Sequence, residues 1–356
     1  MKKVLLLQSQ IREYRIPTFK HVAEKYELTV ATYGDEKKTE DFGLNVIKLK
    51  TIGIGPFQFI KGLRHLAREY DVVVMQPDLH IPSCFLLPFL PHRNKVVSWS
   101  IGFRCSYEHP YITTRKHVLA DNLFERVLEK CDANIFYMDK AKEFWKDSTL
   151  NMDKVFVAPN TTGVEANCND NRSLKKDVLF IGTLYKGKGI DLLIKSFAEA
   201  CRTQHSDSKL YIIGKGPMRE DLEVIAQSNN ISDQVVFVGP VYDEQIISTY
   251  FQKAVLCISP TQGGLTCPKS MGYGVPFVCR KDAITGGEIY HMTTGVNGIM
   301  YEQDSELTGI IVDAMNNPDK FIEMGTLAKS YYDNNATPKH MAEGIIDAIE
   351  YVSNKN

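Results

Sequence analysis

The stretch ISPTQGGLTCPKSMGYGVPFVCRKDAITGGEIYHMTTGVNGIMY, residues Ile258–Tyr301, decides the fold. It begins in an apolar strand and contains two glycine pairs, which start at Gly263 and Gly286. A short helix is expected to begin after the first pair, at Thr266. Glycine turns that lead into helix N-termini bind phosphate, because free amide groups and the positive end of the helix dipole meet there. The stretch therefore predicts an α/β sheet built around a phosphorylated ligand.

Apolar strand-like segments alternate with helical segments along nearly the whole chain. The run Val72–Met75 is apolar at every position, which is typical of parallel sheets that helices cover on both faces. The expected strands are Val4–Leu7, Leu28–Thr32, Asn45–Leu49, Val72–Met75, Val96–Trp99, Ala133–Tyr137, Val155–Ala158, Val178–Ile181, Leu210–Ile213, Val235–Val238, Val255–Ile258 and Phe277–Cys279. The expected helices include Ile16–Tyr26, Phe57–Tyr70, Ile190–Cys201, Arg219–Gln227, Asp243–Phe251 and Pro338–Val352. This alternation predicts an α/β fold with two Rossmann-like, doubly wound domains.

A polar stretch between Asn160 and Lys176 lacks periodicity and predicts a linker. The expected boundaries are residues 1–162 for the N-terminal domain and 163–335 for the C-terminal domain. The last segment, 336–356, contains a strongly amphipathic helix, which we expect to pack back onto the N-terminal domain.

The composition excludes several classes of protein. The 356 residues carry a net charge of -1 with interspersed charges, whereas general nucleic-acid binders have a basic excess. The eight cysteines form no CxxC pair, which predicts free thiols in a reducing compartment and no metal site. The first apolar run, Val4–Leu7, is too short for a signal peptide, and the longest, Ile81–Leu90, is too short to span a bilayer. A cytoplasmic protein is therefore expected.

Two lysines follow the strand that ends at Ile181, in the segment FIGTLYKGKGIDLLIKSF. Lys186 and Lys188 flank a glycine, after a turn at Gly182 and Thr183. Ligands bind at the carboxyl ends of strands in open α/β sheets, so a lysine there can neutralise a departing diphosphate. The alternative is a pair of solvated loop lysines.

Two further strand ends carry turns. The segment LYIIGKGPMREDLE places glycine and proline in a tight strand-to-helix turn, which mainly supports the fold. In VVFVGPVYDEQ, the backbone at Val241 could hydrogen-bond the edge of a nucleobase, although a plain strand end gives the same pattern.

These segments, in the order IGTLYKGKG, IIGKGP, FVGPV, ISPTQGGLTCPKSMGYGVPFV and GGEIYHMTTGVNGIMY, resemble the retaining nucleotide-sugar glycosyltransferases of GT-B fold, family 4 (glycosyl transferases group 1). The resemblance covers about Val178–Tyr301 and the element VFVAPNT at Val155–Thr161. It is looser in the first domain, chiefly in REYRIPTFKHVAEKYELTV. It implies two domains that face a cleft, with the acceptor on the N-terminal domain and the donor on the C-terminal domain.

The resemblance implies roles for individual residues of the second domain. Lys188 would contact the donor diphosphate, and Lys186 would act as a second catalytic cation, because Thr183 stands where the family usually has an arginine. The backbone at Val241 would meet the base, and Glu288 would lie near the donor. The remaining donor-binding residues that the resemblance implies are Gly182, Gly263, Gly264, Leu265 and Thr266.

The chain departs from the family pattern at two positions. The familiar pair of glutamates spaced by seven residues falls at Thr261 and Lys269, so the chain resembles a variant that lacks both. The second glutamate normally holds the ribose, and a lysine cannot accept hydrogen bonds from its hydroxyl groups. Lys269 stands in the first turn of the expected helix, where a cation opposes the helix dipole unless an anion is bound. We therefore hypothesise that Lys269 contacts the donor phosphate; the alternative is a lysine that points to solvent.

The first domain offers weaker candidates. The family often has a histidine after the strand KVVSWS, where this chain has Ser100 or a close neighbour. Arg104 and His109, in the polar loop that follows, are candidates for catalytic contact with the acceptor or the donor sugar, and a surface role is the alternative. Further candidates at the carboxyl ends of other strands are His80, Arg12 and Arg15, of which Arg15 could equally cap a helix.

The resemblance implies transfer of a hexosyl group from a UDP- or GDP-sugar to a glycan or lipid-linked glycan, with retention and without a metal or other cofactor. The family implies bacterial surface polysaccharide biosynthesis, such as capsule or lipopolysaccharide. Phe57–Arg68 could then contact the inner face of the membrane as a basic amphipathic helix. A helix with one face in the core and one in water is the plainer interpretation. The oligomeric state cannot be read from the sequence.

Three other functions compete with glycosyl transfer. A sugar-nucleotide 2-epimerase of GT-B fold would need acid–base carboxylates, which Thr261 and Lys269 do not supply. A Rossmann oxidoreductase would need GxGxxG after the first strand, where QSQIREYR stands instead. A non-catalytic protein that binds a nucleotide sugar, as a sensor or partner subunit, stays open because the expected glutamates and histidine are missing.

Overall fold

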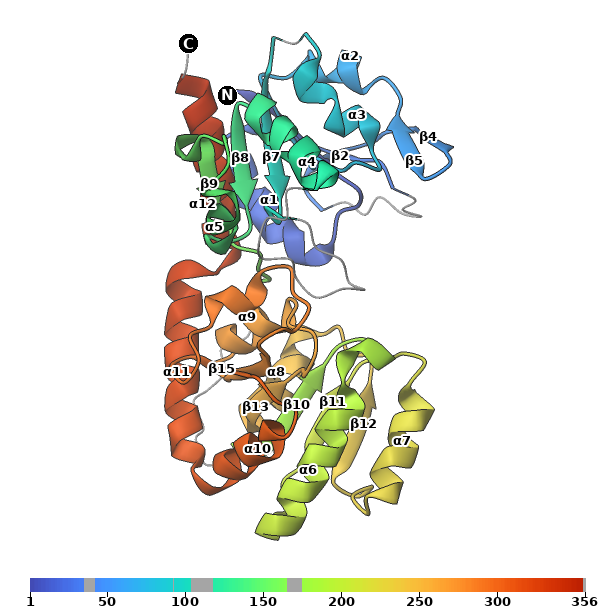
Figure 1. Cartoon of the computed structure of the whole chain (residues 1–356), viewed down its shortest axis with the longest axis vertical. Helices are drawn as coiled ribbons and strands as arrows, with labels where there is room; N and C mark the ends of the chain where they lie inside the picture. The colour runs from blue at the N-terminus through green and yellow to red at the C-terminus, as the bar shows by residue number, and fades with distance from the viewer. Residues whose placement is uncertain (35–41, 92, 104–117, 165–174, 355–356) are drawn as a thin grey trace. The chain divides into compact units, whose positions relative to one another are not determined.

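The computed structural model describes residues 1–34, 42–91, 93–103, 118–164 and 175–354. Contacts within the chain divide it into two compact units. The N-terminal unit contains the described residues up to Asn160 and the segment that begins at Pro338, and the C-terminal unit spans Thr161–Thr337. Each unit is built around a parallel sheet of its own (Figure 1).

Within the described residues, the N-terminal unit has a seven-stranded parallel sheet in the order β3-β2-β1-β6-β7-β8-β9. Its strands are β1 Lys3–Gln8, β2 Glu27–Thr32, β3 Asn45–Lys48, β6 Val72–Met75, β7 Lys95–Ser100, β8 Ala133–Phe136 and β9 Val155–Val157. β1 pairs with both β2 and β6, so the strand order reverses beside β1. Every residue of β6 is buried, as expected for a central parallel strand covered on both faces.

Helices cover this sheet. They are α1 Ile16–Ala23, α2 Leu63–Ala67, α3 Pro82–Phe85, α4 Leu119–Lys130, α5 Lys140–Trp145 and α12 Pro338–Asn354, with short 3₁₀ turns η1 Glu13–Arg15, η2 Leu87–Phe89 and η3 Met152–Lys154. Phe19 of α1 meets Trp99 of β7 edge to face, with ring centroids 6.3 Å apart. Both side chains are almost fully buried, so they fix α1 to the middle of the sheet.

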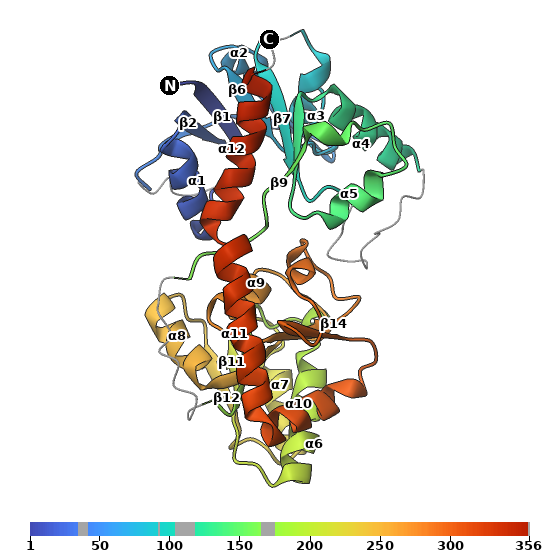
Figure 2. The ribbon, with the colours of Figure 1, turned by 90° about the vertical axis from the view of Figure 1, so that its left-hand side faces the viewer.

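The C-terminal helix α12 belongs to the N-terminal unit, as predicted. It contacts α1, β8 and β9 and lies along the sheet in Figure 2. Its apolar stripe, which includes Met341, Ile345 and Ile349, is fully buried. A Cβ added at Gly344 would stand 2.0 Å from Val157 O of β9. The missing side chain therefore lets α12 approach the backbone of the edge strand.

The prediction of a helix over Phe57–Tyr70 is wrong in its first half. The structure instead has an antiparallel hairpin and then a short helix: β4 Thr51–Ile54, β5 Phe57–Ile60 and α2 Leu63–Ala67. Gly55, with φ of 57°, forms part of the turn between the strands, and Gly62, with φ of 71°, separates the hairpin from α2. β-Branched and aromatic side chains favour strands, and Gly62, in a left-handed conformation, interrupts a continuous helix over this range. The expected basic amphipathic helix therefore does not form.

The C-terminal unit has a six-stranded parallel sheet in the order β12-β11-β10-β13-β14-β15. Its strands are β10 Asp177–Ile181, β11 Leu210–Ile213, β12 Val235–Gly239, β13 Ala254–Ile258, β14 Phe277–Arg280 and β15 Gly298–Tyr301. Its helices are α6 Ile190–Gln204, α7 Arg219–Ser228, α8 Glu244–Lys253, α9 Thr266–Gly272, α10 Glu306–Asn316 and α11 Pro318–Asn335, with 3₁₀ turns η5 Lys186–Lys188 and η6 Glu288–His291. β15, α10 and α11 go beyond the predicted elements. The two sheets confirm the predicted α/β fold with two Rossmann-like units.

Replacing Gly344 with alanine should destabilise the protein by about 2 kcal/mol, because the new methyl group overlaps Val157 O and α12 must move away from β9. Gly309→Ala in α10 is the matched control, since a Cβ there meets nothing within 4 Å and alanine favours helix by about 1 kcal/mol. Thermal unfolding of both variants measures the difference. An unfolding midpoint for Gly344→Ala at or above that of Gly309→Ala would contradict the close contact.

Candidate functional site

The loops after β10 and β13 meet at the carboxyl edge of the six-stranded sheet. Thr261 Oγ1 donates a hydrogen bond of 2.7 Å to Gly187 O, and Tyr185 OH donates to Gln262 Oε1. Thr266, the first residue of α9, donates from Oγ1 to the last carbonyl of β10 at 3.2 Å. These bonds join the lysine-containing loop and the first glycine pair into one surface, so the two segments singled out from the sequence lie together.

A third loop, after β11, packs directly on the loop after β10. A Cβ at Gly214 would lie 1.8 Å from Gly182 O, and one at Gly216 would lie 2.2 Å from Leu184 O. Leu184 N donates to Lys215 O at 3.0 Å, which holds the two loops in register. Glycine is needed at both positions because the backbones touch.

Lys188 is half-buried at the end of the η5 turn in the loop after β10. Burial lowers the pKa of its ammonium group to about 8, and the negative charge of Glu288 acts in the opposite direction. Nζ lies 3.7 Å from the position that a Cβ of Gly182 would occupy. No ion pair joins Lys188 to any carboxylate in the described part of the chain. A cation in such surroundings favours an anionic ligand as its partner.

Glu288 follows the second glycine pair, and it is 3% exposed. Its Oε2 accepts hydrogen bonds from Thr285 Oγ1 at 2.8 Å and from Gly286 N at 2.6 Å. Cys267 of α9 donates from Sγ to Glu288 O at 3.3 Å. The second glycine turn therefore holds a buried carboxylate beside the first glycine loop and close enough to Lys188 to influence its charge.

The other expected donor-binding residues differ in exposure. Lys186 and Thr183 are exposed, whereas Val241 is half-buried and packs against the core of the unit. In the first glycine loop, Gly263 is buried, and a Cβ there would lie 2.2 Å from Ile289 Cγ2. The next three residues, Gly264, Leu265 and Thr266, are half-buried and lead into α9. The amide groups of a first helical turn have no acceptor within the helix and can serve a ligand.

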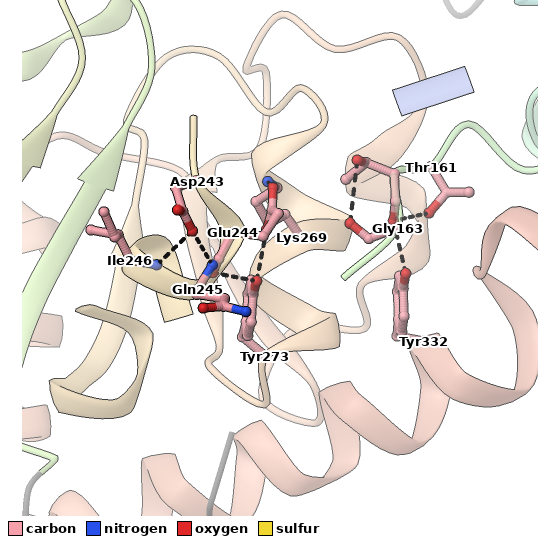
Figure 3. A network of polar contacts seen from close by, with 10 residues as sticks. Thr161, Gly163, Asp243, Glu244, Gln245, Ile246, Lys269, Tyr273 and Tyr332 are labelled. Atoms are coloured by element: carbon pink, nitrogen blue, oxygen red, sulfur yellow. Dashed lines mark hydrogen bonds and ion pairs between the residues drawn. The ribbon is translucent and has the colours of Figure 1, made fainter. Parts of the chain in front are cut away.

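Lys269 has a carboxylate partner that the sequence did not reveal. Its Nζ forms an ion pair with Glu244 Oε1 of α8, and Tyr273 OH donates to Glu244 Oε2 at 2.7 Å (Figure 3). The exposed fractions of the Lys269 and Glu244 side chains are 16% and 23%. Tyr273 stacks on Phe251, with ring centroids 4.5 Å apart. The alternative of a lysine that points freely to solvent is therefore wrong, and the phosphate contact stays a prediction.

Residues 167–331 match the family described as glycosyl transferases group 1. The matched residues lie within the C-terminal unit. An uncharacterized glycosyltransferase of Haemophilus influenzae is 26% identical over 211 residues, which are 54% of this chain and 54% of that protein. The chain spans about half or less of the length of the first curated relatives that it matches.

Solved structures resemble the whole chain. HepE from Anabaena, in complex with UDP, has a TM-score of 0.72 at 16% identity, over 98% of this chain and 100% of that chain. A putative UDP-N-acetylglucosamine 2-epimerase from Listeria monocytogenes has a TM-score of 0.67 at 16% identity, over 99% of this chain and 97% of that chain. At these identities the likeness shows the fold alone. The expected GT-B fold is confirmed, and a putative sugar-nucleotide 2-epimerase shares this fold.

The C-terminal unit holds the described donor-binding candidates, and the other described candidates belong to the N-terminal unit. Arg104 and His109 lie outside the described residues. Ser100 ends β7, and its Oγ accepts a hydrogen bond from Gly102 N. His80 is exposed and lies 3.2 Å from Asp78 Oδ1.

Arg15 does not present its charge to solvent. It is 5% exposed, donates to Asn160 Oδ1 at 2.6 Å and to Tyr137 OH at 3.2 Å, and lies over the ring of Trp99. The guanidinium group therefore lies within the core of the N-terminal unit. Arg15 occupies the N-cap position of α1, but its side chain makes no capping hydrogen bond, and its contact with a ligand stays a prediction. Arg12, in contrast, is exposed.

The described residues contain neither a candidate metal centre nor a membrane-spanning helix. No group of three or more histidine, cysteine, aspartate or glutamate side chains in the described ranges could hold a metal ion. No helix there is both long enough and apolar enough to cross a membrane. The described cysteines are buried and free, as predicted: Cys84, Cys131, Cys201, Cys257, Cys267 and Cys279.

Lys269→Met should lower the free energy of unfolding by about 1–3 kcal/mol, because it leaves Glu244 partly buried without its cation. Lys281→Met is the matched control: its pair with Glu302 is exposed on both sides and should contribute at most about 1 kcal/mol. Denaturant unfolding of both variants provides the comparison. Equal stability of the two variants would mean that the Lys269–Glu244 pair contributes no more than a surface pair.

Proposed function

We propose that this protein transfers a glycosyl group from a nucleotide diphosphate sugar to a hydroxyl group of an acceptor. The observation that carries the proposal is Lys188, a half-buried lysine that forms no ion pair among the described residues. It lies beside interlocked glycine loops in the region that matches glycosyl transferases group 1. A departing nucleoside diphosphate carries negative charge that must be stabilised in the transition state. Lys188 supplies a fixed positive charge where ligands of such sheets bind.

The donor is proposed to lie along the three joined loops. Lys188 contacts the diphosphate, and the exposed Lys186 serves as a second cation next to Thr183. The amide groups of the Gly263–Thr266 loop complete the phosphate contacts, and the backbone at Val241 meets the base. Glu288 acts as a positioning residue, because its carboxylate holds the second glycine turn through Thr285 and Gly286.

The donor sugar is proposed to be a hexose on UDP, since HepE was solved with UDP, and GDP is the alternative nucleotide. Transfer with retention, without a metal or another cofactor, is part of the same proposal. The proposed acceptor is a glycan or lipid-linked glycan of bacterial surface polysaccharide biosynthesis, such as capsule or lipopolysaccharide. The proposed acceptor domain is the N-terminal one, where Arg104 and His109 stay candidates, and the proposed location is the cytoplasm.

Lys269 has two competing roles in this proposal. In the first, its ammonium group contacts the donor phosphate while it keeps Glu244 as a second partner. In the second, it only fixes α8 to α9 through Glu244 and Tyr273. Donor KM separates them: the phosphate role requires Lys269→Met to raise KM, whereas Glu244→Gln, which leaves the ammonium group in place, keeps KM nearly unchanged. An equal effect of both variants on KM would assign a structural role.

The rival functions predict different products from the same donors. A UDP- and GDP-sugar panel should yield free UDP or GDP and a glycosylated product when an acceptor is present. An epimerase would instead convert the sugar nucleotide to its 2-epimer without an acceptor, as nuclear magnetic resonance would show. A non-catalytic protein would bind a donor tightly without turnover. Either of the last two results would overturn glycosyl transfer.

Lys188→Met should weaken binding of the nucleoside diphosphate by about 10–100-fold, because a charge-assisted hydrogen bond contributes about 1.5–3 kcal/mol. Lys176→Met is the control, since Lys176 and its partner Asp207 are exposed and precede β10 and β11, at the edge of the sheet opposite the loops. Isothermal titration calorimetry with UDP and GDP measures the affinities. Unchanged affinity in Lys188→Met would remove the central residue of the proposal.

Binding of the diphosphate should also weaken as the pH rises above about 8, where Lys188 loses its proton in the free protein. A bound anion favours the protonated form, so above this pKa binding must take up a proton, and affinity should fall by up to about tenfold per pH unit until it reaches that of Lys188→Met. Below pH 8 Lys188 is already charged, and its contribution is constant. The fall should be absent in Lys188→Met. Affinities measured between neutral and alkaline pH check this, and parallel profiles for the two proteins would contradict it.

A further inference from the structure

The β4–β5 hairpin of the N-terminal unit presents an apolar face that no described element covers. Ile52 pairs with Phe59, and Ile54 pairs with Phe57, in the antiparallel register. Directly opposed residues project to the same side of a hairpin, and alternate residues of one strand share a side. These four side chains therefore form one face. Its members are exposed to 45% at Ile52, 63% at Ile54 and 43% at Phe57, and Phe59 is half-buried.

The opposite face of the hairpin is fixed to the N-terminal unit. Ile60 is 5% exposed, and its amide donates to Ser83 Oγ of α3 at 2.9 Å. The amide of Gln58 donates to His80 O at 2.8 Å, and the Gln58 side chain donates to Tyr33 O at 3.4 Å. The hairpin lies beside α3 at the rim of its unit (Figure 1). The outward face is therefore held in place while its side chains meet solvent.

Two lysines continue the outward face at the base of the hairpin. Lys61 N donates to Lys50 O at 2.8 Å, so the ladder extends by one pair beyond Thr51 and Ile60. Alternation then places Lys50 and Lys61 on the side of Ile52 and Phe59. The face consists of an apolar tip with a pair of exposed cations behind it.

The charged residues of the segment 42–68, which contains the hairpin, are all basic. Residues 42–68 contain no aspartate or glutamate and carry the cations Lys48, Lys50, Lys61, Arg64 and Arg68, although the whole chain has a net charge of -1. In the described structure Lys50, Lys61, Arg64 and Arg68 are exposed. Pairing of this face with the same face of a second copy would bring like charges together, whereas an anionic surface complements them.

We propose that the β4–β5 hairpin docks onto an anionic lipid surface, with Ile52, Ile54 and Phe57 in the acyl boundary and Lys50 and Lys61 at the level of the lipid phosphates. Apolar side chains that enter the interface, combined with lysines that reach anionic headgroups, form a peripheral membrane contact. This docking goes beyond the glycosyl transfer proposed above and does not depend on it. A chain without transferase activity would bind lipid through the same hairpin.

Flotation of the full-length protein with vesicles tests the docking. We expect binding at low salt to vesicles of phosphatidylcholine with about 30% phosphatidylglycerol, and much weaker binding to phosphatidylcholine alone. Ile54→Ser with Phe57→Ser should reduce binding at least about tenfold. Lys50→Gln with Lys61→Gln should reduce it by about fivefold per lysine, and added salt should have a similar effect.

Matched controls come from exposed positions of the C-terminal unit. Val224→Ser with Leu327→Ser, at 62% and 52% exposure, and Lys195→Gln with Lys281→Gln should leave binding unchanged. Ile54→Trp adds a positive signal: its fluorescence should shift to the blue with anionic vesicles and be quenched by brominated lipid, whereas the native Trp99 and Trp145 are buried.

Three results would overturn the proposal. They are absence of wild-type binding at low salt, equal loss of binding in the hairpin and control variants, and an unshifted Ile54→Trp spectrum in the presence of anionic vesicles. A concentration-dependent dimer that Ile54→Ser with Phe57→Ser abolishes, without vesicle binding, would assign the face to self-association instead.

Discussion

The parallel pairing of β10 with β11 on one side and β13 on the other is the constraint on which the candidate site depends. Because the three strands run in the same direction, their following loops leave the sheet at one edge. Three turns then share a small space, and glycine lets their backbones approach: Gly214 and Gly216 lie against the loop after β10. The same crowding half-buries Lys188, whose Nζ lies 5.9 Å from the ring centre of Tyr185.

Lys188 and Lys269 are two lysines of one unit with different electrostatic surroundings. Both are largely removed from water, but Lys269 has the carboxylate of Glu244, which is itself held by Tyr273. The charge of Lys188 is opposed by burial and supported by Glu288 only at a distance, so its pKa falls. A bound diphosphate would compensate Lys188 directly. At Lys269, the diphosphate would have to share the ammonium group with Glu244. The proposed function therefore rests on Lys188.

Much of the fold could be predicted because its signals are local. The bounds of Val72–Met75 and Leu210–Ile213 agree with β6 and β11 residue for residue, since buried parallel strands are short, apolar and flanked by polar turns. The positions of the glycine loops and of Lys188 at strand ends could also be predicted, because each lies within a single strand-to-loop segment.

Other features could not be predicted, because they depend on packing between distant segments. Glu244 follows Asp243, which caps α8, and stands in the first turn of that helix. Its partner Lys269 stands 25 positions later, and the pair exists only because α8 and α9 meet. Arg15 looked like a free cation beside a strand end, yet its acceptor Asn160 lies 145 positions away.

The hairpin shows a second limit of prediction from sequence. The same apolar residues can fit both the repeat of a helix and the repeat of a strand. Between residues 57 and 66 the apolar side chains suit a helical stripe, but those of 52, 54, 57 and 59 also suit two paired strands with one common face. Gly55 and Gly62 favour the hairpin, since both adopt positive φ. A hairpin and a helix would contact a membrane in different orientations. A helix would lie flat, whereas the apolar tip from Ile52 to Ile54 extends about 7 Å along the strand. Interfacial elements bury their apolar faces by about 5–10 Å, so a tip of this length can reach the acyl boundary while Lys50 and Lys61 stay among the headgroups.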